Sequence, residues 1–314
     1  MPPPLLVLVG PTGVGKTAVA VRLAGHVPME VVSADSRQVY RGLDIGTGKP
    51  TAEERAAVPH HLLDVVEPGE RYHAARFRAD ALAAIAAIHG RGRLPVVVGG
   101  TGLYVRALLR GLVPAPPADP ALRASLMRWA AEHGAPALHA RLAAVAPDIA
   151  RRLHPNDRVR VVRALEVHAG PGHGAGDTGT GDWAAAPRAW RLVVIGLARA
   201  RARLNTAIAE RARSMVARGM MEEVRRLLQA GHDPTRPPMD GIGYRQLALA
   251  LSGRMAVEEA LRLMIRDTSR YAKRQMTWFQ READIRWLDV DAAGGVEGAA
   301  EAVQKHITRE GLIE

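Results

Sequence analysis

The residues with the clearest chemical signature stand near the start of the chain, in the run Gly10-Pro11-Thr12-Gly13-Val14-Gly15-Lys16-Thr17. This run matches the pattern G-x-x-x-x-G-K-[ST] in full. It follows an apolar segment of strand type at 5–9 and precedes a segment of helical spacing at 16–24, which is the context that the pattern requires. Backbone amides of such a loop, together with the positive end of the following helix, bind phosphate oxygens. We therefore predict that this loop holds the phosphates of a substrate.

Two side chains of the loop have distinct expected roles. Lys16 would place its ammonium on the terminal phosphates, and Thr17 would offer its hydroxyl to a Mg²⁺ cofactor. The pattern does not identify the phosphate compound. A nucleotide such as ATP is the default ligand, and an alkyl diphosphate has the same two charged groups and fits the same loop.

A carboxylate follows the second predicted strand, at 30–33. Because the carboxyl ends of parallel strands line the ligand crevice, Asp35 is expected in the same cleft as the phosphate loop. It could hold Mg²⁺ through water, act as a general base toward a nucleophile, or cap the turn that follows it. No other predicted strand runs into a carboxylate in this way. That absence weakens an ATP-hydrolase interpretation, because the usual metal-binding aspartate has no second candidate.

Strand-type and helix-type segments alternate around these residues. Strands are expected at 5–9, 30–33, 94–98, 191–197 and 285–288, and helices at 16–24, 74–89, 203–217, 221–230 and 257–280. This alternation predicts an α/β fold, with a P-loop NTPase-like parallel sheet covered on both faces. Only helical periods occur from 121 to 168, so a helical insertion domain is predicted at 114–190, between core segments 1–113 and 191–314. The glycine-rich stretch 170–181 is predicted to be a mobile loop.

The composition bears on the partners of this chain. It has 43 Lys+Arg against 32 Asp+Glu, a formal charge of +11, which suggests a nucleic-acid partner, although an arginine-favouring codon bias gives the same excess. The absence of Cys excludes disulfides, thiolate catalysis and Cys-ligated zinc. His60 and His61 are adjacent and lack a third ligand, so we interpret them as structural. No signal peptide and no apolar run of about 18 residues is present, so we expect a cytoplasmic protein with no membrane partner.

Further runs are too specific to be generic α/β sequence. They are Asp35-Ser36-Arg37-Gln38-Val39-Tyr40, Asp44-Ile45-Gly46-Thr47-Gly48-Lys49-Pro50, Pro59-His60-His61-Leu62-Leu63-Asp64, Val98-Gly99-Gly100-Thr101-Gly102-Leu103-Tyr104, His154-Pro155-Asn156-Asp157, Arg163-Ala164-Leu165-Glu166-Val167, Gly243-Tyr244-Arg245 and Tyr271-Ala272-Lys273-Arg274-Gln275-Met276-Thr277-Trp278-Phe279. Over about residues 5–290 their order and content closely resemble the bacterial tRNA dimethylallyltransferases, also called tRNA isopentenyltransferases. The resemblance implies transfer of a dimethylallyl group from dimethylallyl diphosphate to N6 of the adenine just 3′ of the tRNA anticodon. Pyrophosphate leaves, and the phosphate loop holds this diphosphate rather than ATP.

The resemblance also implies roles for single residues. Asp35 would take the proton of the adenine amine, Thr101 would lie at the catalytic centre, and Arg211 would reach the diphosphate, with Arg213 and Arg218 as close alternatives. Contacts with the tRNA anticodon stem-loop are implied for Asp35, Ser36, Arg37, Gln38, Thr101, Arg123, Asp157, Arg158, Val159, Arg160 and Val161. Lys273 and Arg274 are predicted on other grounds: with Arg270 they have the spacing i, i+3, i+4 of one basic helical face. Such a face is either solvated or in contact with RNA, and with Trp278 nearby we favour RNA contact. Many relatives have Gln at the position of Val159 and Ala at that of Gly48. The family leads us to expect a monomer.

Three other functions are compatible with the motifs. A P-loop kinase for small molecules would use the loop for ATP and Asp35 as the base for a hydroxyl. A related prenyltransferase would modify free adenine nucleotides, but the +11 charge and the helical insertion argue against it, since a mononucleotide needs neither. A nonenzymatic RNA-binding protein would use a nucleotide as a switch.

Overall fold

A computed structural model describes residues 1–112, 119–170 and 190–314. The chain divides into two units: a larger one formed by the described residues up to Gly111 and from 190 onward, and a smaller one within Leu112–Asp182. The predicted mobile loop lies outside the described residues from 171 onward. The predicted domain boundaries lie within or beside segments that are not described, so their positions stay predictions.

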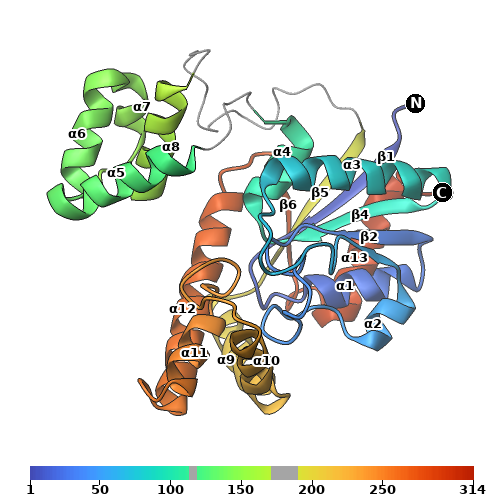
Figure 1. The fold of residues 1–314 in the computed structure, drawn as a ribbon. Helices are drawn as coiled ribbons and strands as arrows, with labels where there is room; N and C mark the ends of the chain where they lie inside the picture. Colours follow the sequence, from blue (N-terminus) through green and yellow to red (C-terminus); the bar gives the residue numbers. More distant parts are fainter. Residues whose placement is uncertain (113–118, 171–189) are drawn as a thin grey trace. The chain divides into compact units, whose positions relative to one another are not determined.

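The larger unit is built on an all-parallel sheet of six strands in the order β3-β2-β4-β1-β5-β6 (Figure 1). The strands are β1 (Pro4–Val9), β2 (Met29–Ser33), β3 (His60–His61), β4 (Leu94–Gly99), β5 (Arg191–Ala198) and β6 (Arg286–Asp289). The α/β parallel-sheet prediction is therefore confirmed. Strand β3 was not predicted because two histidines form no apolar run. Strand β6 does end in a carboxylate, contrary to the expectation, but at the sheet edge opposite β3.

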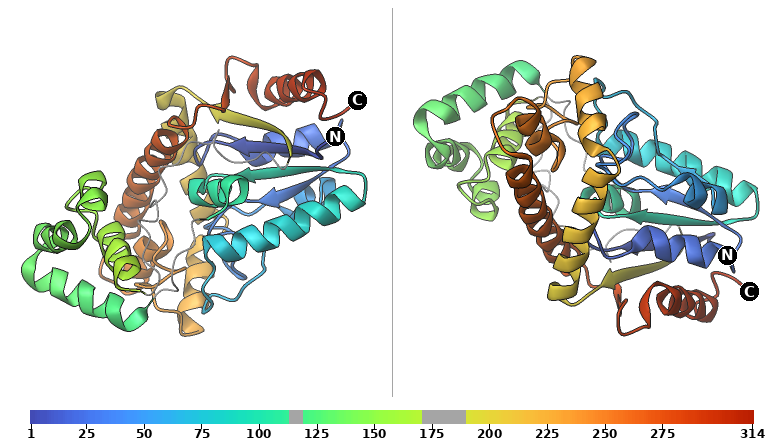
Figure 2. Two further views of the ribbon diagram at one scale, coloured as in Figure 1. Left: turned by 90° about the horizontal axis from the view of Figure 1, so that it is seen from above. Right: turned by 90° about the horizontal axis from the view of Figure 1, so that it is seen from below.

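Both faces of the sheet are buried, as the apolar strands require. Leu5, Val7 and Val9 of β1 enter one core and Leu6 and Leu8 enter the other, all fully buried. Helices α3 (Ala74–Gly90) and α4 (Gly102–Arg110) pack on the first face, and α1 (Lys16–Ala24) and α13 (Gly295–Arg309) on the second (Figures 1 and 2). The α4 helix and the short α2 (Ala52–Ala57) were not predicted.

The chain leaves β1 and β4 in opposite directions along the sheet. After β1 it passes through α1 to β2, whereas after β4 it continues to β5 on the other side of β1. Such a divergence between neighbouring strands opens a crevice at their carboxyl ends. The phosphate loop, Asp35 and Thr101 follow β1, β2 and β4, so all three stand at this edge.

Four helices of the larger unit pack against one another beside the sheet (Figure 1). They are α9 (Arg201–Ala217), α10 (Met220–Gln229), α11 (Tyr244–Leu251) and α12 (Val257–Phe279). Three match predicted helices, and the short α11 is new. Among the described residues, no helix combines the length and apolar character needed to cross a membrane.

The smaller unit is helical and has its own core. It comprises α5 (Pro120–His133), α6 (Ala135–Val145), α7 (Pro147–Arg152) and α8 (Arg158–Ala169). Leu126, Leu138, Leu142, Val162 and Leu165 are buried between these helices. The helical character predicted for 121–168 is thus confirmed, although two apolar residues of these helices, Val145 and Val159, are 43% and 75% exposed.

Candidate active site

The phosphate loop joins β1 to α1 at the carboxyl edge of the sheet. Helix α1 begins at Lys16, with Gly15 at its N-cap, so the unpaired amides of its first turn belong to the loop. The Lys16 ammonium folds over the loop and donates hydrogen bonds to the carbonyl oxygens of Gly10 and Pro11, both at 2.9 Å. The amides of the loop and the Lys16 ammonium thus lie at the same edge of the sheet, and their binding of a phosphate stays a prediction.

Asp35 caps the turn that follows it, which is one of the roles that the sequence left open. Its Oδ1 accepts hydrogen bonds from the backbone N–H groups of Arg37 at 2.8 Å and Gln38 at 3.3 Å, so this oxygen caps the turn after β2. Its Oδ2 accepts no hydrogen bond within the described segments, and the residue borders two cavities. One oxygen therefore stabilises the turn while the other is available for chemistry.

Thr101, at the N-cap of α4, connects that turn to the neighbouring strand. Its hydroxyl oxygen accepts a hydrogen bond from the N–H of Ser36 at 3.1 Å, and its own N–H donates to the carbonyl of Ala34 at 3.3 Å. A Cβ on Gly99 would lie 2.1 Å from that carbonyl oxygen, so the two strand ends approach this closely only because residue 99 is glycine. Thr101 is therefore held next to the Asp35 turn, although it borders neither cavity.

Two adjoining cavities, of about 370 Å³ and about 310 Å³, lie at this edge and share Thr12, Asp35, Thr47, Arg211 and Met215 as walls. We call the first the apolar-side cavity, because its other walls include Ile208, Ala212, Ile242, Tyr244 and Met264. We call the second the phosphate-side cavity, because its other walls include Gly13, Gly15, Lys16, Thr17 and Arg218. Asp35 and Arg211 stand where the two cavities meet.

The three candidate arginines of the α9 region differ in position. Arg211 borders both cavities and has no hydrogen bond or ion pair within the described segments. Arg218, just after α9, borders the phosphate-side cavity but not the apolar-side cavity. Arg213 is exposed and borders neither. The geometry therefore favours Arg211 over Arg213 at the junction.

The electrostatics of the junction follow from burial and from neighbouring charges. Burial lowers the pKa of the Lys16 ammonium to about 8, and the charge of Arg211 adds to this effect, whereas Asp35 opposes it. Burial also lowers the pKa of Arg211, and Asp35 again opposes the shift. Lys16 and Arg211, two half-buried cations beside Asp35, form a site that an added anion stabilises.

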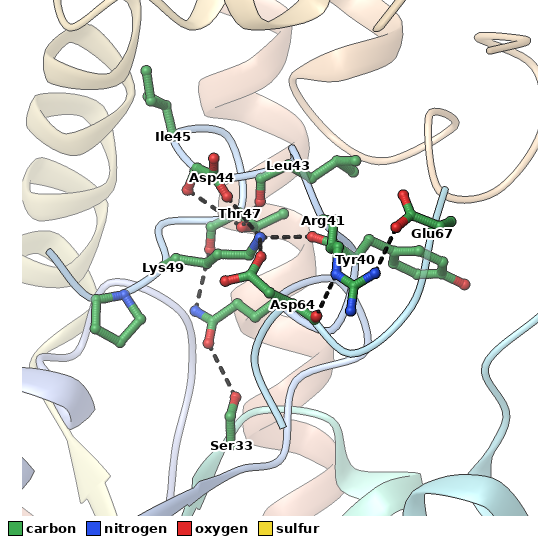
Figure 3. Close-up of polar contacts among 12 residues, drawn as sticks. Ser33, Tyr40, Arg41, Leu43, Asp44, Ile45, Thr47, Lys49, Asp64 and Glu67 are labelled. Carbon is green, nitrogen blue, oxygen red and sulfur yellow. Dashed lines mark hydrogen bonds and ion pairs between the residues drawn. The ribbon is translucent and has the colours of Figure 1, made fainter. Parts of the chain in front are cut away.

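The segment 44–49 forms a wall of both cavities and is fixed by a buried lysine (Figure 3). The Lys49 ammonium donates to the carbonyl of Tyr40 at 2.6 Å and to Asp44 at 2.7 Å, and it also contacts Asp64. The side chain is 2% exposed, so these partners replace its water. Lys49 is therefore structural and is not available to a phosphate.

A buried glutamate holds the same wall from α10. Glu223 accepts hydrogen bonds from the N–H groups of Asp44 at 3.0 Å, Ile45 at 2.7 Å and Gly46 at 3.0 Å. The hydroxyl of Tyr244 donates a fourth at 2.6 Å. Sequence analysis missed Glu223, because an acidic residue that directly follows another in a helix gives no indication that its side chain is buried.

Gln275 of α12 is another functional candidate that was not singled out. Its Oε1 accepts a hydrogen bond from the N–H of Thr12 at 2.8 Å, and its Nε2 donates to the carbonyl of Gly100 at 2.9 Å. The residue is 6% exposed. One amide thus connects the phosphate loop to the residues that precede Thr101.

The predicted RNA contacts of the larger unit fall into three groups. Ser36, Arg37 and Arg274 border the apolar-side cavity. Lys273 is exposed on α12. Gln38 instead borders the phosphate-side cavity, and its amide is used internally: it donates to the carbonyl of Gly48 at 3.1 Å and accepts from the hydroxyl of Ser33 at 3.0 Å.

The predicted contacts of the smaller unit are also unequal. Asp157 caps α8 by accepting from the N–H of Arg160 at 3.2 Å, and Arg158 and Val159 are exposed. Arg123 forms a bidentate pair with the buried Glu166 at 2.8 and 2.6 Å. Val161 is fully buried. The Val161 side chain therefore faces the core of the helical unit, and an RNA contact at this position stays a prediction.

The described residues contain no cluster of three or more His, Asp or Glu side chains able to hold a metal ion. His61 Nε2 lies 2.6 Å from the Glu30 carboxylate and His60 Nδ1 2.8 Å from the carbonyl of Val58, in agreement with a structural role. Thr17 borders the phosphate-side cavity with Asp35. A hydroxyl and a carboxylate fit an ion that takes its other ligands from phosphate and water.

A phosphate loop at the switch point of an all-parallel sheet, with a helical unit inserted in the chain, defines a P-loop-containing α/β protein. Two family models match the sequence, "IPP transferase" over residues 38–282 and "Isopentenyl transferase" over residues 3–64. The chain belongs to the tRNA dimethylallyltransferase family, also called the IPP transferases, whose members are prenyltransferases.

Relatives and solved structures agree with this assignment. The chain is 50% identical over 287 residues to tRNA dimethylallyltransferase 1 of Syntrophotalea carbinolica, with 91% of each chain covered. It is 52% identical over 297 residues to the tRNA dimethylallyltransferase of Anaeromyxobacter sp. strain K, with 92% and 95% covered. The tRNA isopentenylpyrophosphate transferase of Bacillus halodurans aligns with a TM-score of 0.69 at 38% identity, with 98% of both chains covered. A eukaryotic dimethylallyltransferase acting on tRNA gives 0.77 at 27% identity, with 97% and 78% covered.

Proposed function

We propose that this chain transfers a dimethylallyl group from dimethylallyl diphosphate to N6 of the adenine 3′-adjacent to the anticodon of tRNA, releasing diphosphate. Family membership supports the reaction. One structural observation supports its location: Asp35 and Arg211 border both the cavity that the phosphate loop, Lys16 and Arg218 line and the cavity whose walls include Ile208, Ala212 and Met264. A prenyl diphosphate has this same division into an anionic and an apolar half.

The phosphate-side cavity would bind the diphosphate. Amides of the loop, the Lys16 ammonium and the Arg211 guanidinium stabilise the charge that develops on oxygen as the C–O bond to the allylic carbon breaks. The residues fit a Mg²⁺ ion that arrives with the diphosphate, held on the protein by Thr17; bound there, it would neutralise further phosphate charge. The dimethylallyl chain would lie against the apolar walls.

Asp35 would act as the general base. As the amine nitrogen of the adenine attacks the allylic carbon, its proton passes to the free Oδ2 of Asp35. The hydrogen bonds to Oδ1 stabilise the turn and fix the orientation of the carboxylate. Thr101 positions this turn through the N–H of Ser36. We assign Thr101 a positioning role at the catalytic centre.

The tRNA would present its anticodon loop with the target base extruded, which costs less in a loop than in a duplex. Ser36, Arg37 and Arg274 border the cavity that would receive the base, and Lys273 and the exposed arginines of the smaller unit would contact phosphates. All groups used in the chemistry come from one chain, so we propose a monomer. We propose that it acts on tRNA in the cytoplasm.

Incubation with labelled dimethylallyl diphosphate and unmodified tRNA, followed by nuclease digestion, tests the proposal. We expect label in an adenosine next to the anticodon, and none in parallel reactions with AMP or ATP as acceptor. Rapid ATP turnover without RNA, and no label in the tRNA, would instead establish a kinase. Label in free nucleotides alone would establish the nucleotide prenyltransferase.

A further inference from the structure

The end of α9 presents a second arginine to the phosphate-side cavity. Arg218 follows Arg211 by two helical turns, and Ser214 lies between them on the same face. All three residues border the cavity that Lys16 also borders. Arg213, on another face of the same helix, borders neither cavity.

Lys16, Arg211 and Arg218 border this cavity without an ion pair to a described residue, beside two carboxylates, Asp35 and Glu54. Neither Arg211 nor Arg218 makes a hydrogen bond or ion pair with any described residue. The two guanidinium groups are close enough that the charge of Arg218 adds to the effect of burial in lowering the pKa of Arg211. Asp35 and Glu54 oppose this shift, but one oxygen of each is already hydrogen-bonded to backbone N–H groups. Cations that share a cavity in this way repel one another until an anion lies between them.

We propose that Arg218 is a second diphosphate-binding residue. It contacts the terminal phosphate and keeps the pyrophosphate group bound to the protein while the bond to the allylic carbon breaks. This inference rests on the proposed function. Arg211 borders both cavities and so lies nearer the reacting carbon, whereas Arg218 borders only the phosphate-side cavity and so faces the outer phosphate. Dimethylallyl diphosphate has three negative charges when fully ionised, and Lys16, Arg211 and Arg218 supply three positive charges.

The test compares Arg218→Ala with Arg213→Ala, two exposed arginines of the same region, so that loss of one positive charge is common to both. Binding of inorganic pyrophosphate in the presence of Mg²⁺ is measured by calorimetry, and KM for dimethylallyl diphosphate at saturating tRNA. We expect Arg218→Ala to raise both constants about tenfold, the effect of losing one charge-assisted hydrogen bond. Arg213→Ala should leave both unchanged, and neither variant should change the KM for tRNA. Arg218→Lys should recover part of the loss, because it keeps the charge but not the guanidinium fork.

Equal pyrophosphate affinity in the two alanine variants would overturn the inference. So would an Arg218→Ala variant in which the KM for tRNA rises as much as the KM for dimethylallyl diphosphate. A wild-type protein that binds pyrophosphate but does not prenylate tRNA would overturn the proposed function and leave the Arg218 assignment intact. The reverse case, with normal prenylation and no effect of Arg218→Ala, would refute Arg218 alone.

Discussion

The guanidinium of Arg211 occupies the space that a side chain on Gly48 would need. An ideal Cβ on Gly48 would lie 1.8 Å from Nη2 of Arg211 and 3.2 Å from Cε of Met215. Gly48 belongs to the wall that Lys49 and Glu223 fix from two sides, so this wall has little freedom to move. The lack of a side chain at residue 48 therefore determines where the arginine rests.

We predict that Gly48→Ala displaces Arg211 rather than unfolding the protein. The clashing atom is the far end of a flexible side chain, so the guanidinium can move away. The KM for dimethylallyl diphosphate should rise about three- to tenfold, because about 1 kcal/mol of a charged hydrogen bond is lost. The left-handed backbone at φ +62° should separately cost about 1–2 kcal/mol of folding stability.

Gly92→Ala is the matched control for this substitution. Gly92 has φ +68°, and a Cβ there would meet nothing within 4 Å. The melting temperature of Gly92→Ala should fall as much as that of Gly48→Ala, but its KM for dimethylallyl diphosphate should be unchanged. Identical kinetics of the two variants would show that Gly48 does not control Arg211.

Asp35→Asn should separate the two roles of the aspartate. Asparagine keeps the Oδ1 that accepts from Arg37 and Gln38, so the turn persists, but it has no basic oxygen for the proton of the adenine amine. We expect kcat to fall about 10²–10⁴-fold, with near-normal affinity for tRNA and diphosphate. Asp35→Ala should lose activity and also stability, because the turn loses its cap. Substantial turnover by the asparagine variant would remove Asp35 as the base.

The affinity for diphosphate should depend on pH through Lys16. Burial lowers the pKa of its ammonium to about 8, so free protein loses this charge as the pH rises through 8. The dissociation constant for dimethylallyl diphosphate should then rise about tenfold per pH unit above 8 and be nearly constant between 7 and 8. The substrate itself is fully ionised in this range, since the last phosphate pKa is about 6.

The protonation of Lys16 affects folding stability in the opposite sense to diphosphate binding. A lysine whose pKa is lowered in the folded state destabilises the fold fully below the folded pKa, and this cost disappears as the pH rises toward the unfolded value. Melting temperatures of free protein should therefore gain a stabilising contribution above pH 8, while the added stability from diphosphate shrinks. Lys16→Arg, which stays charged, should abolish the pH dependence of binding. A flat binding profile from pH 7 to 9.5 in the wild type would contradict the assignment.

The parts of the site that sequence could predict are those with local patterns. The loop at 10–17 carries its own motif, and the rule that parallel strands share a carboxyl edge was enough to bring Asp35 to it. The resemblance already favoured Arg211 over Arg213 and Arg218, but helical spacing gives only the relative faces of these arginines and not which face meets the loop.

The residues that sequence analysis missed act on distant backbone atoms. Glu223 accepts from the N–H of Asp44, 179 residues away, and Gln275 from that of Thr12, 263 residues away. A buried polar side chain with backbone partners has no characteristic neighbours in sequence. Such positions become visible only when burial and hydrogen bonds are known.

Gln275 should affect turnover through the relative placement of the phosphate loop and Thr101. Gln275→Leu leaves the Thr12 N–H and the Gly100 carbonyl without partners, at a cost of about 1–3 kcal/mol. The two segments should separate slightly, and since a misplacement of 1 Å costs about 10²-fold in rate, kcat should fall at least tenfold. Single-turnover rates with bound tRNA and diphosphate measure this effect directly.

Gln246→Leu supplies the control, because Gln246 is equally buried and equally bonded. It accepts from the N–H of Gly243 at 2.7 Å and donates to Asp267 at 3.0 Å, and neither of these partners belongs to the phosphate loop. The two leucine variants should lose similar stability, whereas only Gln275→Leu should slow the chemical step. If both variants slowed it in proportion to their loss of melting temperature, Gln275 would be an ordinary core residue. A selective loss at Gln275 would instead mean that the geometry of this active site is fixed from α12 as well as from the sheet.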